Sequence, residues 1–422
     1  MRLRALNIFV GDCLVGKLFQ YGEMTRFQVE DSYADDFGAP VLSLSFVSSN
    51  FEQRRSLLRD VLNPKFNGKE DRLPTFFQNL LPEGLLRQHL AKLRGCDPSD
   101  HFELLAACGG DLPGNVYALP VDLNRDEVAS LVTQSQDSLE MSVMASAMAE
   151  GFSLSGMQPK LSLCEDGGRY TFRGRLGSHS IIGKLPTVDY PLLPELEMLS
   201  MRLARLAGVN ACDCDLVQMG SLDMGDFFPV AAGGHFLAVK RFDRGPGVRY
   251  QVEDFAQVFS VDPSDKYKQY SYLDMMRLMM GIPSLGLAAV EELLRRLLVN
   301  ELLGNYDAHL KNLGLIYLDG KRPTLSPAYD IVAYSSYISG RGHALSITGS
   351  GDKHERLSPS VLRTICNELG VSEAPLRGVV RESVLMALSK WETEIVSSPL
   401  LEKQKENLLA HFRSHPLVKR FN

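Results

Sequence analysis

The hydrophobic pattern of the chain changes its period near Phe152 and again near Tyr250, and this order restricts the possible folds. After Phe152 the segments PKLSLCED, GGRYTFRG and SIIGKLP read as strands. A helix follows, PELEMLSMRLARLAGV, whose apolar residues recur at three and four. CDLVQM and HFLAVKRFDR are further strand candidates, and after Tyr250 the chain is mostly helical. A block of strands with one inserted helix, followed by a helical block, predicts an α+β fold.

The first part of the chain has its own pattern. Residues 1 to about 60 read as strands and turns, in LNIFVG, LVGKLFQY, TRFQVE and VLSLSFV. Residues 76–109 read as helical, NVYALPV as a short strand, and the polar stretch after it as a linker. We therefore predict a small β-rich N-terminal subdomain, a linker and a two-lobed core, with boundaries at 1–122, 123–139 and 140–422. Within the core we expect a small lobe over about 140–240 and a large helical lobe over about 241–422.

Composition narrows the class of protein. The chain has 422 residues, of which 45% are hydrophobic and 23% charged, as in soluble globular proteins of two or three packed units. The net charge of −6 argues against a basic nucleic-acid-binding surface. No apolar run reaches the roughly 18 residues of a membrane span. The seven scattered cysteines favour reduced thiols and a cytoplasmic protein.

The segment GNYDAHLKN is the strongest candidate for chemistry. It follows a long apolar helix, and Asp307 and Asn312 are five residues apart in it. In a loop, this spacing lets the carboxylate face a hydroxyl nucleophile while the amide oxygen binds Mg²⁺. Asp330, in SPAYD, is placed to be a second metal ligand. The competing interpretation is that all three residues cap turns or helices, since short motifs often match by chance.

Two further elements fit the same chemistry. In SLSGMQPK, Gly156 lets the backbone approach phosphates, although the segment also fits an ordinary β-turn. Lys184 lies in the apolar strand SIIGKLP, and Glu197 lies on the next helix. A strand lysine paired with a helix glutamate orients the phosphates of ATP in kinases. Alone, Lys184 also fits an edge-strand lysine that extends to solvent.

These elements occur in the order of a kinase, and the chain as a whole resembles the HipA-like serine/threonine kinases of bacterial toxin–antitoxin systems. The resemblance covers nearly the whole chain. It is carried by FFQNLLPEG, GGDLPGNV, SLSGMQPKLSL, IIGKLP, VKRFDR, VEDFAQ, GNYDAHLKNLGLIY and LSPAYDIV. It implies a protein-kinase-like fold with ATP between two lobes.

The resemblance also implies roles for individual residues. Asp307 resembles the catalytic base, and Asn312 and Asp330 resemble the Mg²⁺ ligands. The implied ATP-binding residues are Lys184, Glu197, Ser155, Gly156, Met157, Gln158, Lys160, Lys240, Phe242 and His309. Lys240 and Phe242 match the hinge that holds adenine, although some relatives have an acidic residue where this chain has Lys240. Ser153 or Ser155 matches the serine that the family autophosphorylates beside its phosphate loop.

The resemblance implies partners as well. Members of the family bind a helix-turn-helix antitoxin, and we expect contact with DNA mainly through such a protein. Known protein targets of the family include aminoacyl-tRNA synthetases, so growth arrest through translation is the expected outcome.

Other functions remain open from the sequence. DAHLKN also fits the D-x-H-x-x-N loop of phosphoinositide-type kinases, which would make the acceptor a lipid or a small molecule. A metal-dependent hydrolase that uses Asp307, His309 and Asp330 would want more histidine ligands. A regulator that only partners the antitoxin would not need an intact set of catalytic residues.

Overall fold

The computed structural model describes residues 3–48, 50–123, 159–171, 180–223, 233–340 and 342–421. The chain forms two compact units, each built from three stretches of sequence. The first unit consists of residues 1–181, 243–263 and 316–322, and the second of residues 182–242, 264–315 and 323–422. The predicted linker over 123–139 lies almost entirely outside the described residues, so the boundaries predicted from the sequence stay predictions.

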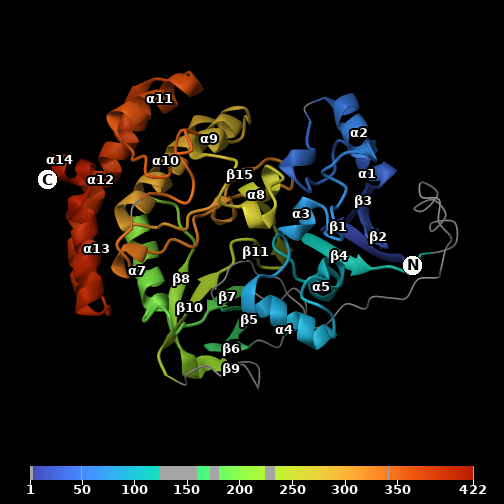
Figure 1. Ribbon diagram of the computed structural model, residues 1–422, viewed down its shortest axis with the longest axis horizontal. Helices are drawn as coiled ribbons and strands as arrows, with labels where there is room; N and C mark the ends of the chain where they lie inside the picture. Colours follow the sequence, from blue (N-terminus) through green and yellow to red (C-terminus); the bar gives the residue numbers. More distant parts are fainter. Residues whose placement is uncertain are drawn as a thin grey trace. The chain divides into compact units, whose positions relative to one another are not determined.

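The first unit begins with an antiparallel four-stranded sheet in the order β3-β2-β1-β4 (Figure 1). The sequence predicted all four strands: β1 (Leu3–Val10), β2 (Cys13–Tyr21), β3 (Met24–Val29) and β4 (Val116–Pro120). In β1, the alternate residues Leu6, Ile8 and Val10 are buried, as the pleat of a half-buried strand requires. The core continues into α5 (His101–Cys108), which contacts β4 and buries Phe102 and residues 104–108.

The first unit also contains further helices and strands. They are α1 (Asp31–Asp35), α2 (Phe51–Arg59), α3 (Thr75–Gln78), α4 (Gly84–Arg94), β5 (Lys160–Asp166), β6 (Arg169–Thr171), β11 (Arg244–Gly245), β12 (Val248–Arg249), β13 (Gln251–Asp254) and α8 (Phe255–Val258). β5 and β6 form the antiparallel hairpin that the sequence predicted.

One predicted strand is wrong. In VLSLSFV, the residues Leu44–Phe46 form a single 3₁₀ turn. The carboxylate of Glu253 accepts hydrogen bonds from the backbone N–H of Leu44, at 2.7 Å, and from the hydroxyl of Ser43, also at 2.7 Å. The first of these bonds occupies a backbone group that a strand would offer to a neighbouring strand, so a side chain from a distant part of the sequence replaces the sheet partner.

A buried arginine fixes the loop GGDLPGNV. The Arg244 guanidinium is paired with the carboxylates of Asp111, at 2.9 Å, and Asp243, at 2.6 Å. It also donates to the carbonyl oxygens of Leu112 and Gly114. Gly114 has φ 75°, and a Cβ there would lie 2.8 Å from a backbone nitrogen of residue 252. Only glycine fits this close approach of two backbones.

Helices dominate the second unit. They are α7 (Leu193–Leu206), α9 (Tyr272–Met280), α10 (Gly286–Leu303), α11 (Pro359–Leu369), α12 (Glu373–Ser397), α13 (Glu402–Ser414) and α14 (Pro416–Phe421). Its strands are β8 (Cys214–Gln218), β9 (Leu222–Asp223), β10 (His235–Lys240) and β15 (Thr324–Leu325). β7 (Ile181–Lys184) and β14 (Gly314–Tyr317) lie where the chain passes from one unit to the other.

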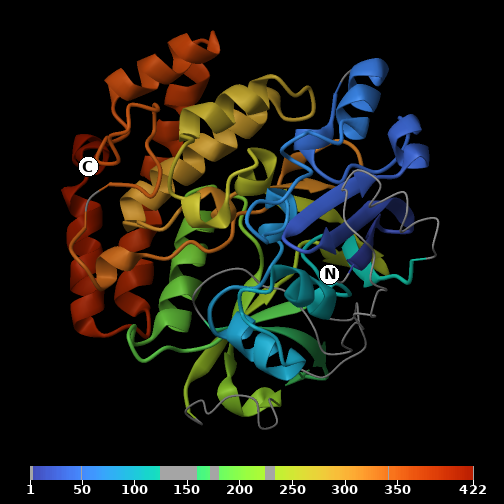
Figure 2. The ribbon, with the colours of Figure 1, turned by 45° about the vertical axis from the view of Figure 1, so that its right-hand side comes forward.

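Helix α7 links the strands of the second unit to its helical part. It contacts β8 and β10, which pair antiparallel, and it also contacts α12 (Figure 2). Trp391 of α12 is fully buried, and its indole N–H donates to the Leu203 carbonyl of α7 at 2.9 Å. Its ring packs on Phe412 of α13, with 5.0 Å between ring centroids.

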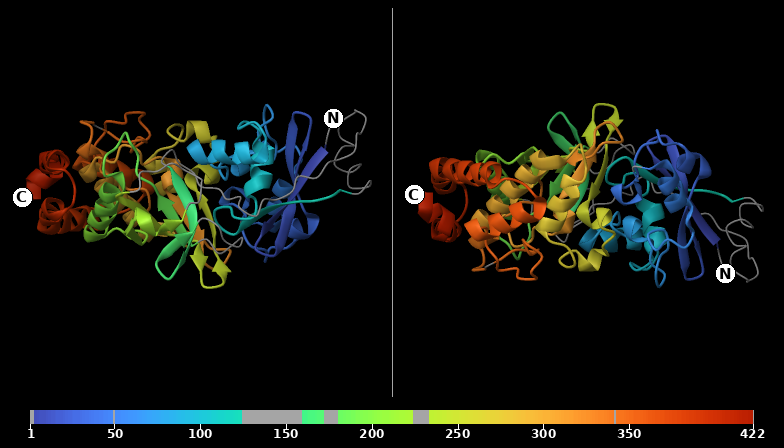
Figure 3. Two further views of the ribbon diagram at one scale, coloured as in Figure 1. Left: turned by 90° about the horizontal axis from the view of Figure 1, so that it is seen from below. Right: turned by 90° about the horizontal axis from the view of Figure 1, so that it is seen from above.

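The C-terminal helices α12 and α13 lie side by side in every view (Figure 3), and both contact α10. Among the described residues, no helix is both long enough and apolar enough to cross a membrane.

Candidate functional site

Lys184, at the end of β7, is the centre of a buried ion cluster. Its ammonium group donates to the carboxylate of Glu197 on α7 and to the carboxylate of Asp330. Lys184 is 5% exposed and Glu197 1%. Burial alone lowers the pKa of the Lys184 ammonium, but the charges of Asp330 and Glu197 more than compensate and hold it well above its ordinary value. The lysine therefore stays charged, which binding a phosphate requires.

Asp330 reaches this cluster because the segment before it is fixed to the backbone near β8. The N–H of Ala328 donates to the carbonyl of Asn210 at 2.7 Å, and the N–H of Cys212 donates to the carbonyl of Ala328 at 2.9 Å. Asp330 itself has φ 55°, in the left-handed region that side chains other than glycine seldom adopt. This backbone conformation costs energy, and it occurs at the residue whose carboxylate contacts Lys184.

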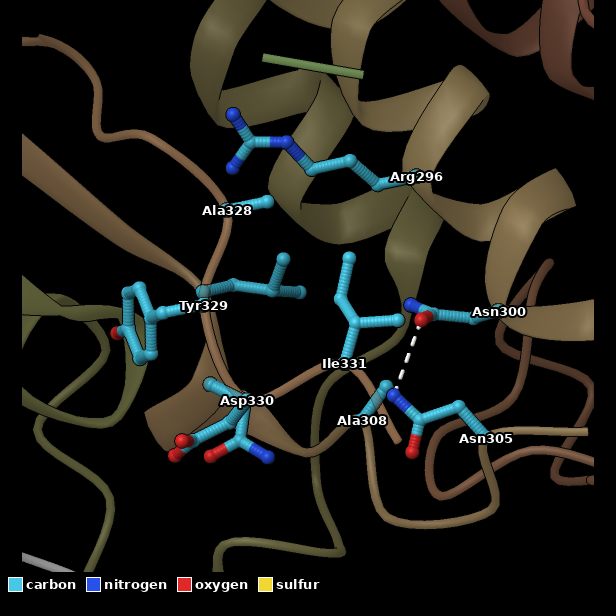
Figure 4. Close-up of a pocket in the computed structure, with 10 residues that line it drawn as sticks. Arg296, Asn300, Asn305, Ala308, Ala328, Tyr329, Asp330 and Ile331 are labelled. Carbon is cyan, nitrogen blue, oxygen red and sulfur yellow. Dashed lines mark hydrogen bonds between the residues drawn. The ribbon is translucent and has the colours of Figure 1, made fainter. Parts of the chain in front are cut away.

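The loop that carries Asp307 begins at the end of α10. Gly304 ends the helix with φ 65°, where a Cβ would lie 2.7 Å from the Ser335 side chain. The side chain of Asn305 then donates to the Asn300 side chain of α10 at 3.0 Å (Figure 4). The N–H of Asp307 in turn donates to the Asn305 side-chain oxygen at 3.3 Å. The helix end thus fixes the loop through two asparagines.

Asp307 and Asn312 both lie in this loop, and a hydrogen bond joins them. The Asn312 amide nitrogen donates to the Asp307 carbonyl at 2.9 Å, which determines how the amide group is oriented. The hydroxyl of Tyr267 donates to Oδ1 of Asp307 at 2.6 Å. The Asp307 side chain is partly exposed. An oriented, partly exposed carboxylate can accept a proton from an incoming hydroxyl group.

Asn312 and Asp330 line one pocket, together with Arg296, Asn300 and Asn305. In Figure 4, Asp330 and Asn305 lie on opposite sides of the pocket, left and right, with Ile331 and Ala308 between them. One carboxylate and one amide oxygen are too few for an all-protein metal cage, and the described residues contain no group of three or more His, Cys, Asp or Glu that could hold a metal ion. Two oxygen ligands do fit Mg²⁺, which keeps waters and shares its remaining positions with substrate phosphates.

The remaining predicted residues of the second unit differ in burial. His309 is buried, and its ring meets the Tyr267 ring edge-on, with centroids 5.0 Å apart. Phe242 is partly exposed and packs against Tyr329, with 5.7 Å between ring centroids. The side chain of Lys240 is exposed, and its N–H donates to the Asp213 carbonyl at 2.8 Å. This N–H is therefore already used between strands.

Five of the predicted residues lie outside the described part of the chain, and a sixth belongs to the first unit. Ser153, Ser155, Gly156, Met157 and Gln158 lie outside the described residues. Lys160 is the first residue of β5 and belongs to the first unit.

Three residues that support the site were not predicted from the sequence. Tyr267 and Arg296 belong to no motif. Asn305 lies inside the motif, but its spacing suggests no role. Arg296 is buried and donates to the carbonyl of Ser326 at 2.7 Å, which fixes the start of the segment that leads to Asp330. A buried, charged residue within an otherwise apolar helix is the one signal that could have identified Arg296.

Comparisons with known proteins agree with these observations. The sequence model of the HipA-like C-terminal domain matches residues 152–391, and that of the HipA N-terminal domain matches residues 6–119. A protein of Sinorhizobium fredii described as a candidate kinase, Y4dM, is 35% identical over 409 residues, which are 94% of this chain and 93% of the relative. The serine/threonine-protein kinase toxin HipA of Shewanella oneidensis is 26% identical over 360 residues, 79% of this chain and 76% of the toxin.

The fold has a counterpart among solved structures. The complex of Shewanella oneidensis HipA with HipB and operator DNA contains a chain that superimposes with a TM-score of 0.70 at 22% identity, and the match covers 99% of this chain and 96% of that chain. The predicted α+β, kinase-like fold is confirmed. With both halves matched by family models and a relative at 35% identity along nearly the whole length, the chain belongs to the HipA family.

Proposed function

We propose that this chain is an ATP- and Mg²⁺-dependent serine/threonine-protein kinase. The observation that carries the proposal is the ion cluster of Lys184, Glu197 and Asp330 in the same unit as the loop that holds Asp307 and Asn312. Each of these residue types has a role in phosphoryl transfer, and their order along the chain is that of a kinase. A purely structural role for Lys184 would not require two carboxylate partners, one of them on a strained backbone.

In this reaction the oxygen of the acceptor serine or threonine attacks the γ-phosphorus of ATP. The bond from that phosphorus to the β,γ-bridging oxygen breaks, and ADP leaves. Asp307 accepts the proton of the acceptor hydroxyl. Lys184, oriented by Glu197, binds phosphate oxygens of ATP. Asn312 and Asp330 would hold Mg²⁺, which neutralises charge on the phosphates.

We further propose that the kinase is the toxin of a toxin–antitoxin pair. The support is membership of the HipA family and the similarity to a chain crystallised with HipB and operator DNA. The partner would be a helix-turn-helix antitoxin that makes most of the DNA contact, as expected for a chain of net charge −6. The substrate would be a cytoplasmic protein, with an aminoacyl-tRNA synthetase as the first candidate.

The test is transfer of ³²P from γ-labelled ATP to proteins of a lysate, with wild-type protein and the Asp307→Asn variant, in Mg²⁺ and in EDTA. Labelled protein bands that need both Mg²⁺ and Asp307 support the proposal. Label in the lipid or small-molecule fraction would instead support the phosphoinositide-like alternative.

Expression of the two forms in a bacterial host tests the toxin role. Growth arrest by the wild type and not by Asp307→Asn is expected. Equal arrest by both forms would mean that the chain acts without phosphoryl transfer, as a regulator.

A further inference from the structure

Tyr267 lies in the segment before α9 and outside every motif of the sequence, yet its hydroxyl is 2.6 Å from Oδ1 of Asp307. We propose that Tyr267 is a positioning residue, which orients the Asp307 carboxylate so that Oδ2 meets the acceptor hydroxyl. This inference rests on the proposed kinase function. It adds Tyr267 to the site and explains how the Asp307 carboxylate is oriented.

The backbone at and next to Tyr267 is fixed to neighbouring loops. The N–H of Leu310, in the loop of Asp307, donates to the carbonyl of Lys266 at 3.3 Å. The ammonium group of Lys353 donates to the carbonyl of Tyr267 itself at 2.8 Å. The phenol ring therefore moves with the loop that carries the base, and its hydroxyl can define a direction.

The ring of Tyr267 has a packing partner, His309, in the loop that carries Asp307. The rings of Tyr267 and His309 meet edge-on, at an interplanar angle of 80°. This arrangement is favourable for aromatic pairs and restricts rotation of both rings. With its ring and its backbone held, the hydroxyl of Tyr267 has little freedom other than rotation about the C–O bond.

The chemistry of the carboxylate and the hydroxyl group also fits this role. An ionised carboxylate only accepts hydrogen bonds, and a tyrosine hydroxyl can donate one without losing its proton near neutral pH. One oxygen of Asp307 is then committed to Tyr267. The backbone N–H of Asp307 is held by Asn305, so both ends of the residue are fixed. A general base acts efficiently only when the accepting oxygen is already oriented.

The variant Tyr267→Phe keeps the ring against His309 and removes only the hydroxyl group. We expect kcat to fall by roughly 10–100-fold, while KM for ATP stays within about twofold. Tyr337→Phe is the matched control, because its hydroxyl donates to the Pro191 carbonyl at 2.9 Å and not to Asp307. We expect the control to keep kcat within about twofold of the wild type.

The pH profile separates positioning from a general loss of structure. Without the donor, the ionised form of the base is less stabilised, so the acid limb of the kcat profile should move to higher pH. Other titratable groups near the pair are His309, Tyr334, Lys266 and Lys353, and Tyr267→Phe leaves all four in place. A loss of folded protein would lower the whole profile without moving its limb.

A double-mutant cycle of Tyr267→Phe and Asp307→Ala, measured by urea unfolding, tests the contact without any catalysis. We expect the two changes to be coupled by a factor of about ten in the folding equilibrium constant. No coupling, or a Tyr267→Phe protein with wild-type kcat and an unmoved acid limb, overturns the positioning role. A wild-type protein without transferase activity overturns the proposed function itself, and the coupling then reports only a structural contact.

Discussion

The ammonium group of Lys184 donates a hydrogen bond to the carboxylate of Asp330, which lies 146 residues further along the chain. Because Glu197 binds the same ammonium group, Lys184 pairs with two carboxylates at once. Removing one partner of a buried ion pair costs about 3–5 kcal/mol, so Lys184→Ala would impair folding as well as ATP binding. The Asp307→Asn variant therefore gives a cleaner test of the site than a variant of Lys184.

We expect Asp307→Asn to bind ATP nearly as well as the wild type and to transfer phosphate roughly 10²–10⁴-fold more slowly, since only the proton acceptor is lost. Calorimetry with Mg·ATP and a ³²P transfer assay measure the two properties. Asp213→Asn is the control, because its carboxylate is 79% exposed on the same unit. Turnover near the wild-type rate would remove Asp307 from the mechanism.

For Asp330→Asn, we expect weaker binding of Mg·ATP, in contrast to Asp307→Asn. Asparagine tolerates the left-handed backbone at this position, and Glu197 still pairs with Lys184, so we expect the variant to fold. It loses one negative charge from the proposed Mg²⁺ site, and Mg·ATP should bind at least roughly tenfold more weakly. The comparison is calorimetry with and without EDTA, against Asp307→Asn. Equal weakening of binding in both variants would contradict the separate roles.

If the chain phosphorylates itself at Ser153, as we propose, Ser153→Ala should keep its transferase activity for longer. A phosphate on Ser153 adds about −1.5 to −2 charges at pH 7 beside the segment that is to bind ATP phosphates. A preference of ~3 kcal/mol for the displaced segment would lower the affinity for ATP by roughly a hundredfold. Intact mass spectra of wild-type, Ser153→Ala and Ser155→Ala proteins identify the serine. Phosphate on Ser153 in the Asp307→Asn protein would point to another kinase.

Glu253 makes the stability of the first unit depend on pH. Burial raises the pKa of its carboxyl to about 7, although Tyr317, Leu44 and Ser43 donate to it and act in the opposite direction. A raised pKa means that the folded state binds more protons than the unfolded state between about pH 4.5 and 7. The contribution to stability is therefore present in full below about pH 4.5 and is lost as the pH rises to about 7, by about 3 kcal/mol.

The variant Glu253→Gln tests this dependence, because it keeps an acceptor for Tyr317 and Leu44 but cannot ionise. Urea unfolding followed by circular dichroism at pH 5 and at pH 8 should show a smaller difference between the two pH values for the variant than for the wild type. An identical pH dependence of both proteins would mean that other groups cause it.

Trp391→Phe should lower the free energy of unfolding by roughly 2–4 kcal/mol. The change removes the donor to Leu203 and leaves a space beside Phe412. Leu385→Ala on the same helix is the control, because Leu385 is 42% exposed and its loss should cost at most roughly 0.5 kcal/mol. Urea unfolding followed at 222 nm compares the three proteins, and equal stability of Trp391→Phe and the wild type would contradict the role of the indole group.

The sequence predicted those residues of the site that lie in short motifs or in neighbouring elements of the chain. Asp307 and Asn312 follow a long apolar helix, and the pair of Lys184 and Glu197 follows from one strand and the next helix. The contact of Asp330 with Lys184 depends on a backbone bridge between Ala211 and Ala328, which no periodicity in the sequence encodes.

Tyr267 was missed for the same reason, since it lies 40 residues before its partner in an irregular segment. In the fold, the four strands of the first sheet and helix α7 were predicted correctly. VLSLSFV failed because Glu253, 209 residues further along, binds the backbone of Leu44 and so replaces a strand neighbour.

The left-handed backbone of Asp330 also restricts how this site can be lost in evolution. Asparagine and glycine are the residues that such a conformation accepts at little cost, whereas a β-branched or bulky residue would add strain to the segment as well as remove the carboxylate. A homologue that keeps the fold but loses the activity proposed here should therefore carry asparagine or glycine at this position. Either residue would remove the carboxylate that pairs with Lys184 and would add little strain to the segment.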